Sequence, residues 1–173
     1  VYDKYSVVKD IIDRGDAVFT KARGYSIKAL MFNDPEDKLN STENTQPAVF
    51  LSSAALNALL VSRGFSADCY AGHSLGEFSA LHCAGVLSFE DALTLVIRRS
   101  EIMKRAADSQ KGAIMVLFCG ADEAASHIAA SGAKVFVANK NSDKQTAVAG
   151  DGAAVDAFCA YLKQKGITYK KLA

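Results

Sequence analysis

The chain has 173 residues, half of them hydrophobic, with 20 Lys and Arg against 19 Asp and Glu. Its formal net charge of +1 excludes the strongly basic surface that non-specific binding to nucleic acid needs. The N-terminal stretch VYDKYSVVKD is too charged for a signal peptide, and we expect no apolar run of the roughly 20 residues that span a bilayer. We therefore expect a soluble, cytoplasmic protein that has neither nucleic acid nor a membrane as a partner.

The first part of the chain is predicted to be mainly helical. Apolar residues at three- and four-residue spacings predict an amphipathic helix over about 2–21, followed by a short helix over 26–32. After a polar loop, residues 45–64 predict a buried helix with Pro47 in its first turn and Gly64 just past its end.

A short, turn-bounded stretch over 68–72 predicts a buried strand. The small-residue helix that comes after it ends at Gly85, and Ser88 is expected to cap a helix over 89–108. Strand, tight turn and helix thus follow one another around residues 72–76.

From residue 111 onward the pattern alternates in the order β-α-β-β-α-β, which is that of a ferredoxin-like unit. We therefore predict two subdomains, over residues 1–110 and 111–173. The strands are expected at 113–120, 134–141, 145–150 and 167–172, and the helices at 121–132 and 153–166. Because the chain begins with Val and ends in a strand-like stretch, we also expect further segments at both ends.

Four cysteines, Cys69, Cys83, Cys119 and Cys159, lie far apart without a CxxC pair or a histidine at ligand spacing. This pattern does not match a metal site. We expect buried, reduced thiols and no bound metal.

Gly72-His73-Ser74-Leu75-Gly76 matches the nucleophile-elbow pattern, in which small residues allow a sharp strand-to-helix turn that exposes a serine hydroxyl. Ser74 is therefore a candidate nucleophile, and the Leu75 N–H at the helix N-terminus is a candidate oxyanion donor. The alternative is a tight turn that is merely packed by small residues.

A serine nucleophile needs a base, and none of the three histidines is a good candidate. The ring of His73 is expected to point away from the hydroxyl and to pack or hydrogen-bond structurally. His82 lies about 12 Å along the following helix, which is too far. His127 is expected on a solvated helix face. The chain is therefore predicted to lack its own general base.

Arg99 is expected within an apolar stripe of the helix over 89–108, whereas Arg98 falls on the polar face. A guanidinium among apolar side chains is costly unless it meets an anion, and its planar fork suits a carboxylate. Two alternatives follow: an internal ion pair, with Glu77 or Asp91, or a handle for a carboxylate-bearing substrate. The other members of the stripe are Ala92, Val96, Met103 and Ala106.

The stretches TQPAVF, GHSLGEFSALHCAGVLSFEDAL, VIRRSEIM and VANKNSDKQTAVAG resemble the malonyl-CoA:acyl carrier protein transacylases and the acyltransferase domains of polyketide and fatty-acid synthases. The resemblance implies an α/β fold class, with an α/β-hydrolase-like large subdomain and a ferredoxin-like small subdomain. Either subdomain can be incomplete at the ends given.

The resemblance also implies roles for individual residues. Ser74 matches the acylated serine, Leu75 the oxyanion-hole residue, and Arg99 the arginine that pairs with the malonyl carboxylate. Three further residues are candidates for substrate binding: Gln46, His73 and Asn141. The family's N-terminal Gly-Gln-Gly segment, its catalytic histidine and a later glutamine segment are not matched, and Asp143 replaces a common proline.

The function that the resemblance implies is transfer of a malonyl group from CoA to the phosphopantetheine thiol of an acyl carrier protein. The expected partners are this carrier, the CoA thioester and other synthase domains, with no permanently bound cofactor. Two alternatives stay open, namely an acyl hydrolase and a non-catalytic scaffold.

Overall fold

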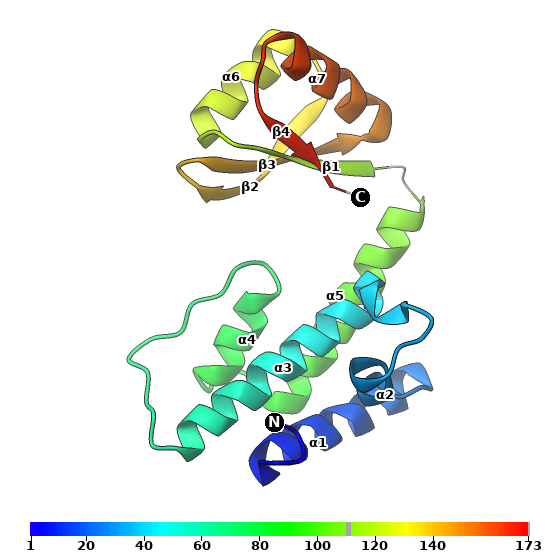
Figure 1. Cartoon of the computed structure of the whole chain (residues 1–173), viewed down its shortest axis with the longest axis vertical. Helices are drawn as coiled ribbons and strands as arrows, with labels where there is room; N and C mark the ends of the chain where they lie inside the picture. Colours follow the sequence, from blue (N-terminus) through cyan, green and yellow to red (C-terminus); the bar gives the residue numbers. More distant parts are fainter. Residues whose placement is uncertain (110–111, 173) are drawn as a thin grey trace. The chain divides into compact units, whose positions relative to one another are not determined.

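The computed structural model describes residues 1–109 and 112–172, which form two compact units, Val1–Arg105 and Ala106–Ala173 (Figure 1). The predicted boundary between residues 110 and 111 falls outside the described residues.

The described part of unit 1 is helical, in the predicted order (Figure 1). Its helices are α1 (Ser6–Arg23), α2 (Ile27–Phe32), a 3-10 turn (Lys38–Asn40), α3 (Thr42–Ser62), α4 (Gly76–Cys83) and α5 (Phe89–Ser109), which runs past the end of the unit. As expected, Ser88 Oγ caps α5 by accepting from the Asp91 N–H at 3.1 Å.

Helix α3 begins at Thr42 rather than at residue 45, so Pro47 lies inside it and not in its first turn. Because proline has no N–H, the carbonyl of Glu43 loses its usual helical donor. The Ser100 hydroxyl of α5 lies 3.4 Å from that carbonyl oxygen. The early start of α3 thereby creates a polar contact between α3 and α5.

The strand predicted over residues 68–72 is wrong. These residues are not in a strand, and nearly all of the segment from Phe65 to Ser74 is exposed. A strand is defined by hydrogen bonds to a neighbour, and none of the described residues of unit 1 forms a strand that could pair with this segment. The α/β-hydrolase-like arrangement of the larger subdomain therefore stays a prediction.

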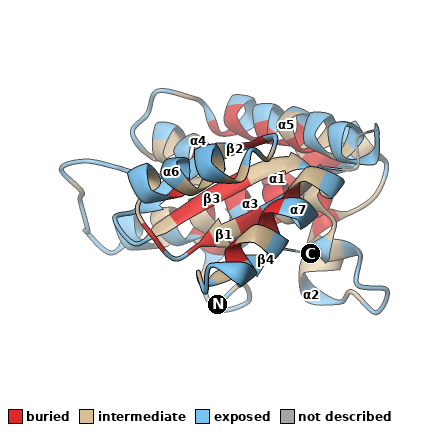
Figure 2. Ribbon diagram, turned by 90° about the horizontal axis from the view of Figure 1, so that it is seen from above, coloured by how far each residue is buried: buried red, intermediate tan, exposed pale blue. Residues whose placement is uncertain are grey.

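In the core of unit 1, helices α1, α3 and α5 each pack one face against the other two. Figure 2 shows buried residues along one face of α5. Phe50 of α3 is fully buried and packs its ring 5.9 Å from that of Phe89 of α5. Buried residues of α3 end at Ala55, so its last two turns carry exposed apolar side chains such as Leu60. The prediction that α3 is buried thus holds for most of its apolar residues from Pro47 to Ala55, with Val49, 46% exposed, as an exception.

A partly buried ion-pair network joins the three helices of this core. Arg23 of α1, whose side chain is only 18% exposed, pairs with Glu43 of α3 at 3.1 Å and with Glu101 of α5 at 3.0 Å. The guanidinium of Arg98, and after it that of Arg23, holds the pKa of the Glu101 carboxyl below its usual range. The network fixes α3 against α5 close to Gln46 and Arg99.

One described helix, α3, is long and apolar enough to cross a bilayer, with a mean hydropathy of 1.2 over an 18-residue window. This corrects the expectation that no apolar run reaches that length. The observation is weak evidence of a span, because core helices pass the same test. Several of its residues, including Phe50 and Leu51, lie in the core of unit 1.

Unit 2 contains a four-stranded antiparallel sheet with the strand order β2-β3-β1-β4, and α6 and α7 cover one face of it (Figure 1). All six predicted elements are confirmed, in the predicted order. Their bounds are β1 Gly112–Leu117, α6 Ala121–Ser131, β2 Val135–Ser142, β3 Gln145–Asp151, α7 Gly152–Gln164 and β4 Tyr169–Lys171. The core between the sheet and the helices includes the fully buried Met115, Val148 and Phe158.

All four cysteines are free, but only two are buried. Cys119 and Cys159 lie in the core of unit 2, and burial raises the pKa of both thiols. Cys83 is half-buried and Cys69 is exposed, because the strand that was expected to bury Cys69 does not form. The prediction of buried thiols is therefore wrong for Cys69.

Gly15→Ala should destabilise unit 1, although alanine is the better helix former by about 1 kcal/mol. A Cβ added at Gly15 would lie 2.1 Å from Cδ2 of Leu51, which is fully buried and has little room to move. Overpacking of this kind costs about 1–3 kcal/mol. Urea unfolding would measure the loss. The double variant Gly15→Ala/Leu51→Ala should show a smaller penalty than the sum of the two single variants, and strict additivity would contradict the clash.

Candidate active site

The elbow is a tight turn that leads into α4. Ser74 has φ 55°, in the left-handed region that non-glycine residues seldom adopt. The turn is closed by the Gly76 N–H, which donates to the His73 carbonyl at 2.9 Å, and by the Glu77 N–H, which donates to the Ser74 carbonyl at 3.2 Å. This backbone leaves the Ser74 side chain exposed.

The two glycines of the elbow have different roles. A Cβ added at Gly72 would lie 2.1 Å from the backbone carbon and oxygen of Gly76, so the chain can pass there only without a side chain. A Cβ added at Gly76 would meet nothing within 4 Å. The turn therefore depends on Gly72.

Leu75 is the N-cap residue of α4, directly after Ser74. Within the described part of the chain, no group accepts a hydrogen bond from its N–H. Free N–H groups at a helix N-terminus, together with the helix dipole, favour negative charge. The backbone beside the serine hydroxyl is thus suited to hold an oxyanion.

Arg99 of α5 reaches the elbow. Its Nη2 donates to Ser74 Oγ at 2.9 Å, and its Nη1 donates to Oε1 of Gln46 in α3. Arg99 is half-buried, whereas Arg98, with a side chain 72% exposed, lies on the solvent side as predicted. Residues from three segments therefore meet at one guanidinium.

The apolar stripe predicted around Arg99 is correct only in its first half. Ala92 and Val96 are buried, but Met103 is 44% exposed and Ala106 is also exposed. The buried face of α5 ends at Ser100, beyond which the helix is no longer covered on that side.

Arg99 makes no ion pair with a carboxylate among the described residues, which corrects the alternative of an internal salt bridge with Glu77 or Asp91. The Asp91 carboxylate instead accepts from the Ser88 hydroxyl at 2.7 Å. Both acceptors of the Arg99 guanidinium are neutral, so its positive charge is not compensated within the described residues.

Gln46 is 6% exposed, and both ends of its amide are engaged. Its oxygen accepts from Arg99, while its nitrogen donates to Thr42 Oγ1 at 2.8 Å and to Met103 Sδ at 3.4 Å. The partners Thr42 and Met103 were not predicted. The four-residue spacings of Thr42 to Gln46 and of Arg99 to Met103 put each pair on one helix face and are the signal that could have found them.

None of the histidines is in contact with Ser74 Oγ. His73 is exposed, and its ring has no partner within residues 1–109 and 112–172, so the expected structural packing is not found. The ring of His82 packs 5.6 Å from that of Phe89, with Nδ1 3.3 Å from the Leu87 carbonyl oxygen. His127 was predicted on a solvated helix face, but it is half-buried beside Tyr161.

Asn141 lies at the end of β2 in unit 2, where its side chain donates to Gln145 Oε1 at 3.0 Å. This contact lies within unit 2, so a role for Asn141 in substrate binding stays a prediction. No group of three or more His, Cys, Asp or Glu side chains suited to a metal ion lies in the described ranges.

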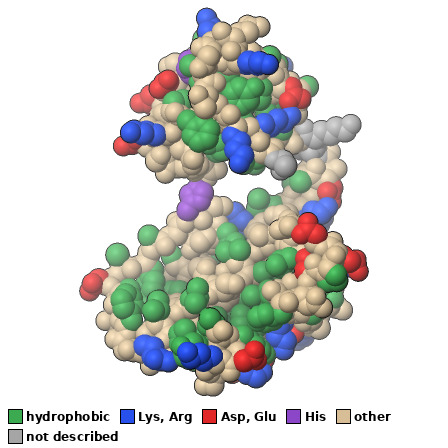
Figure 3. All heavy atoms as spheres, viewed as in Figure 1, with side chains coloured by type: hydrophobic (Ala, Val, Ile, Leu, Met, Phe, Trp, Pro, Cys, Tyr) green, Lys and Arg blue, Asp and Glu red, His purple; other side chains and the backbone are tan. Residues whose placement is uncertain are grey.

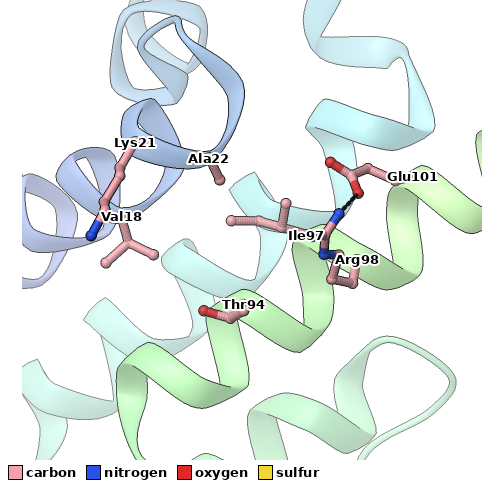
Figure 4. A pocket seen from close by; sticks show the side chains of 7 residues that line it. All are labelled: Val18, Lys21, Ala22, Thr94, Ile97, Arg98 and Glu101. Carbon is pink, nitrogen blue, oxygen red and sulfur yellow. Dashed lines mark hydrogen bonds and ion pairs between the residues drawn. The ribbon is translucent and has the colours of Figure 1, made fainter.

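A pocket of about 430 Å³ lies between α1 and α5 (Figure 4). Its lining includes Val18, Lys21 and Ile97, and its arginine, Arg98, is paired with Glu101 at 2.9 Å. Ser74 and Arg99 do not line it. The pocket is therefore separate from the elbow.

The sequence model of the acyl transferase domain family matches residues 1–173, which is the whole chain. The chain belongs to the acyl transferase domain family. Its curated relatives include the malonyl CoA-acyl carrier protein transacylases of Escherichia coli K12, 40% identical over 161 residues, and of a Synechocystis species, 36% identical over 164 residues. These alignments cover 90% and 94% of the chain but 52% and 50% of the relatives, so the chain spans about half of their length.

Solved structures place the acyl transferase chain in the same family. The MCAT from Streptococcus pneumoniae has a TM-score of 0.85 at 36% identity and covers 99% of this chain and 56% of its own. A malonyl-transacylase in complex with its type II polyketide synthase acyl-carrier protein has a TM-score of 0.88 at 33% identity, with the same coverage. An acyltransferase domain of the salinomycin polyketide synthase has a TM-score of 0.86 at 33% identity, over 99% of this chain and 39% of its own.

Gly72→Ala should disrupt the elbow of this acyl transferase chain, whereas Gly76→Ala should be tolerated. The added methyl group at Gly72 overlaps backbone that cannot move away, while the one at Gly76 enters open space at the start of a helix. Thermal unfolding and hydrogen exchange of α4 amides would measure both effects. Equal effects of the two substitutions would contradict the difference between the two glycines.

Proposed function

We propose that the protein transfers a malonyl group from CoA to the phosphopantetheine thiol of an acyl carrier protein through an acyl-enzyme on Ser74. The observation that carries the proposal is the 2.9 Å contact between Ser74 Oγ and Arg99 Nη2, made by a guanidinium without a carboxylate partner in the described residues. A hydroxyl on an exposed turn and an uncompensated cation together suit an acyl group that ends in a carboxylate.

The proposed reaction has two steps. Ser74 Oγ attacks the thioester carbonyl while Arg99 pairs with the malonyl carboxylate, and the Leu75 N–H stabilises the oxyanion until the CoA thiolate leaves. The carrier's thiol then attacks the serine ester, and the malonyl group leaves on the carrier. The family resemblance assigns the proton transfer to a histidine outside these 173 residues.

The names of the relatives support this assignment. The curated relatives are malonyl CoA-acyl carrier protein transacylases, and one solved relative is bound to its acyl-carrier protein. They support a carrier protein as partner and fatty-acid or polyketide synthesis as context, and they do not favour the acyl hydrolase or the scaffold. A cytoplasmic location and contacts with other synthase domains belong to the same proposal.

The proposed fold of the whole protein is an α/β-hydrolase-like large subdomain and a ferredoxin-like small subdomain, with the boundary in the sequence between residues 110 and 111. The antiparallel order β2-β3-β1-β4 supports the small subdomain. Exposed apolar side chains over α3 and α4 (Figure 3), among them Leu56, Leu60 and Leu81, are compatible with further layers of the large subdomain.

The test is to mix the full-length protein with malonyl-CoA and measure its mass. We expect a malonyl adduct on Ser74 and no adduct in Ser74→Ala. An adduct on another residue, or none at all, would refute the proposal. Release of free acid at an unchanged rate when the carrier is left out would instead indicate a hydrolase.

Arg99→Ala should lower the rate of acylation by malonyl-CoA about 10- to 100-fold, the value of a charge-assisted hydrogen bond, and should affect acetyl-CoA much less. Arg98→Ala is the matched control, because Arg98 is exposed and paired with Glu101. Stopped-flow acylation with both thioesters would measure the rates. Equal losses on the two substrates would exclude Arg99 as the carboxylate handle.

A further inference from the structure

We infer that Gln46 is a positioning residue that sets acyl selectivity: its neutral amide fixes the Arg99 guanidinium without cancelling the positive charge. The charge thus stays available for the carboxylate of the acyl group. The inference rests on the proposed function and goes beyond it by assigning how the malonyl group is selected.

The orientation of the Gln46 amide follows from the chemistry of its neighbours. A guanidinium can only donate hydrogen bonds, so the atom of Gln46 that faces Arg99 must be the oxygen. The amide nitrogen then faces Thr42 Oγ1 at 2.8 Å and Met103 Sδ at 3.4 Å, both of which can accept. Thr42 therefore fixes the amide, and the amide fixes Arg99.

The same chain holds another arginine in a different way. Arg23 is paired with two carboxylates, those of Glu43 and Glu101, at 3.1 and 3.0 Å, which neutralise its charge. Arg99 is held by an amide and a hydroxyl. Holding a half-buried cation with neutral partners alone costs free energy. An arginine with a purely structural role avoids this cost by pairing with carboxylates, as Arg23 does. The neutral partners therefore fit a cation that is reserved for a ligand.

Gln46 acts through Arg99 rather than on the substrate itself. It is 6% exposed, and its amide oxygen and nitrogen already have partners within the protein. An acyl group at Ser74 would meet the guanidinium, whose Nη2 lies 2.9 Å from Ser74 Oγ. This assigns Gln46 a different role from direct substrate binding, which the sequence had predicted.

Gln46→Glu in the full-length protein tests the inference, because it retains the shape of the side chain and adds a carboxylate that pairs with Arg99. The ratio of the acylation rates with malonyl-CoA and acetyl-CoA should fall at least about 10-fold, mainly through a higher KM for malonyl-CoA. Gln164→Glu, the same change of charge at an exposed residue of α7, should leave the ratio as it is in the wild type.

Gln46→Leu is the second test variant, for the case that the glutamate buried in Gln46→Glu prevents folding, which circular dichroism would reveal. It removes the acceptor but not the charge of Arg99, so the ratio should fall less than in Gln46→Glu, about 3- to 10-fold. Thr42→Val should lower the ratio in the same direction, since it frees the amide.

The outcomes separate this inference from the proposed function. If wild-type protein is malonylated on Ser74 but the Gln46 variants lower both rates equally, the inference is wrong and the proposed function stands. If wild-type protein takes up no malonyl group, the proposed function is wrong and the inference is overturned with it. If the malonyl-to-acetyl ratio is lower in Gln46→Leu than in the wild type, and lower still in Gln46→Glu, the result supports both the inference and the proposed function.

Discussion

The guanidinium of Arg99 joins three segments that are far apart in the sequence. It donates to Gln46 in α3 and to Ser74 in the elbow, while its own backbone belongs to α5. The geometry of the site therefore depends on how α3 and α5 pack and on the turn that presents Ser74. A shift of either helix would move the cation away from the hydroxyl, since hydrogen bonds weaken steeply with distance and angle.

The packing that holds α3 against α5 is both apolar and ionic. Phe50 and Phe89 meet in the core, and Arg23 bridges Glu43 and Glu101, which lie close in sequence to Gln46 and Arg99. Close-packed protein interiors allow few alternative arrangements, so the packed helices set the position of half-exposed polar groups on them. The core of unit 1 thereby positions the guanidinium.

The helices and the βαββαβ order could be predicted because apolar periodicity is local and strong in both units. The strand at 68–72 could not be assessed in that way, since a strand depends on a neighbour that the local pattern does not contain. The sequence indicated Ser74, through the elbow motif, and Arg99, through its helical spacing, as separate candidates. Their contact depends on tertiary packing across 25 residues, and that between Arg99 and Gln46 on packing across 53.

The burial of Ala92 and Val96 in the first half of α5 was also predicted correctly. Helical periodicity does not show, however, where the helices that cover this face end. Met103 therefore lies partly exposed, where its sulfur accepts from Gln46 instead of filling the core. That no carboxylate among the described residues pairs with Arg99 is likewise a property of packing, because the sequence offered both Glu77 and Asp91 as partners.

The distribution of these three groups over separate segments matters for recombination between related enzymes. A chimera joined in the exposed stretch between α3 and α4 takes its amide from one parent and its serine and guanidinium from the other. The motif around the serine would be intact in such a hybrid, but the amide and the guanidinium would come from parents in which they did not pack against each other. Crossover points before Thr42 or after Met103 keep the whole set within one parent.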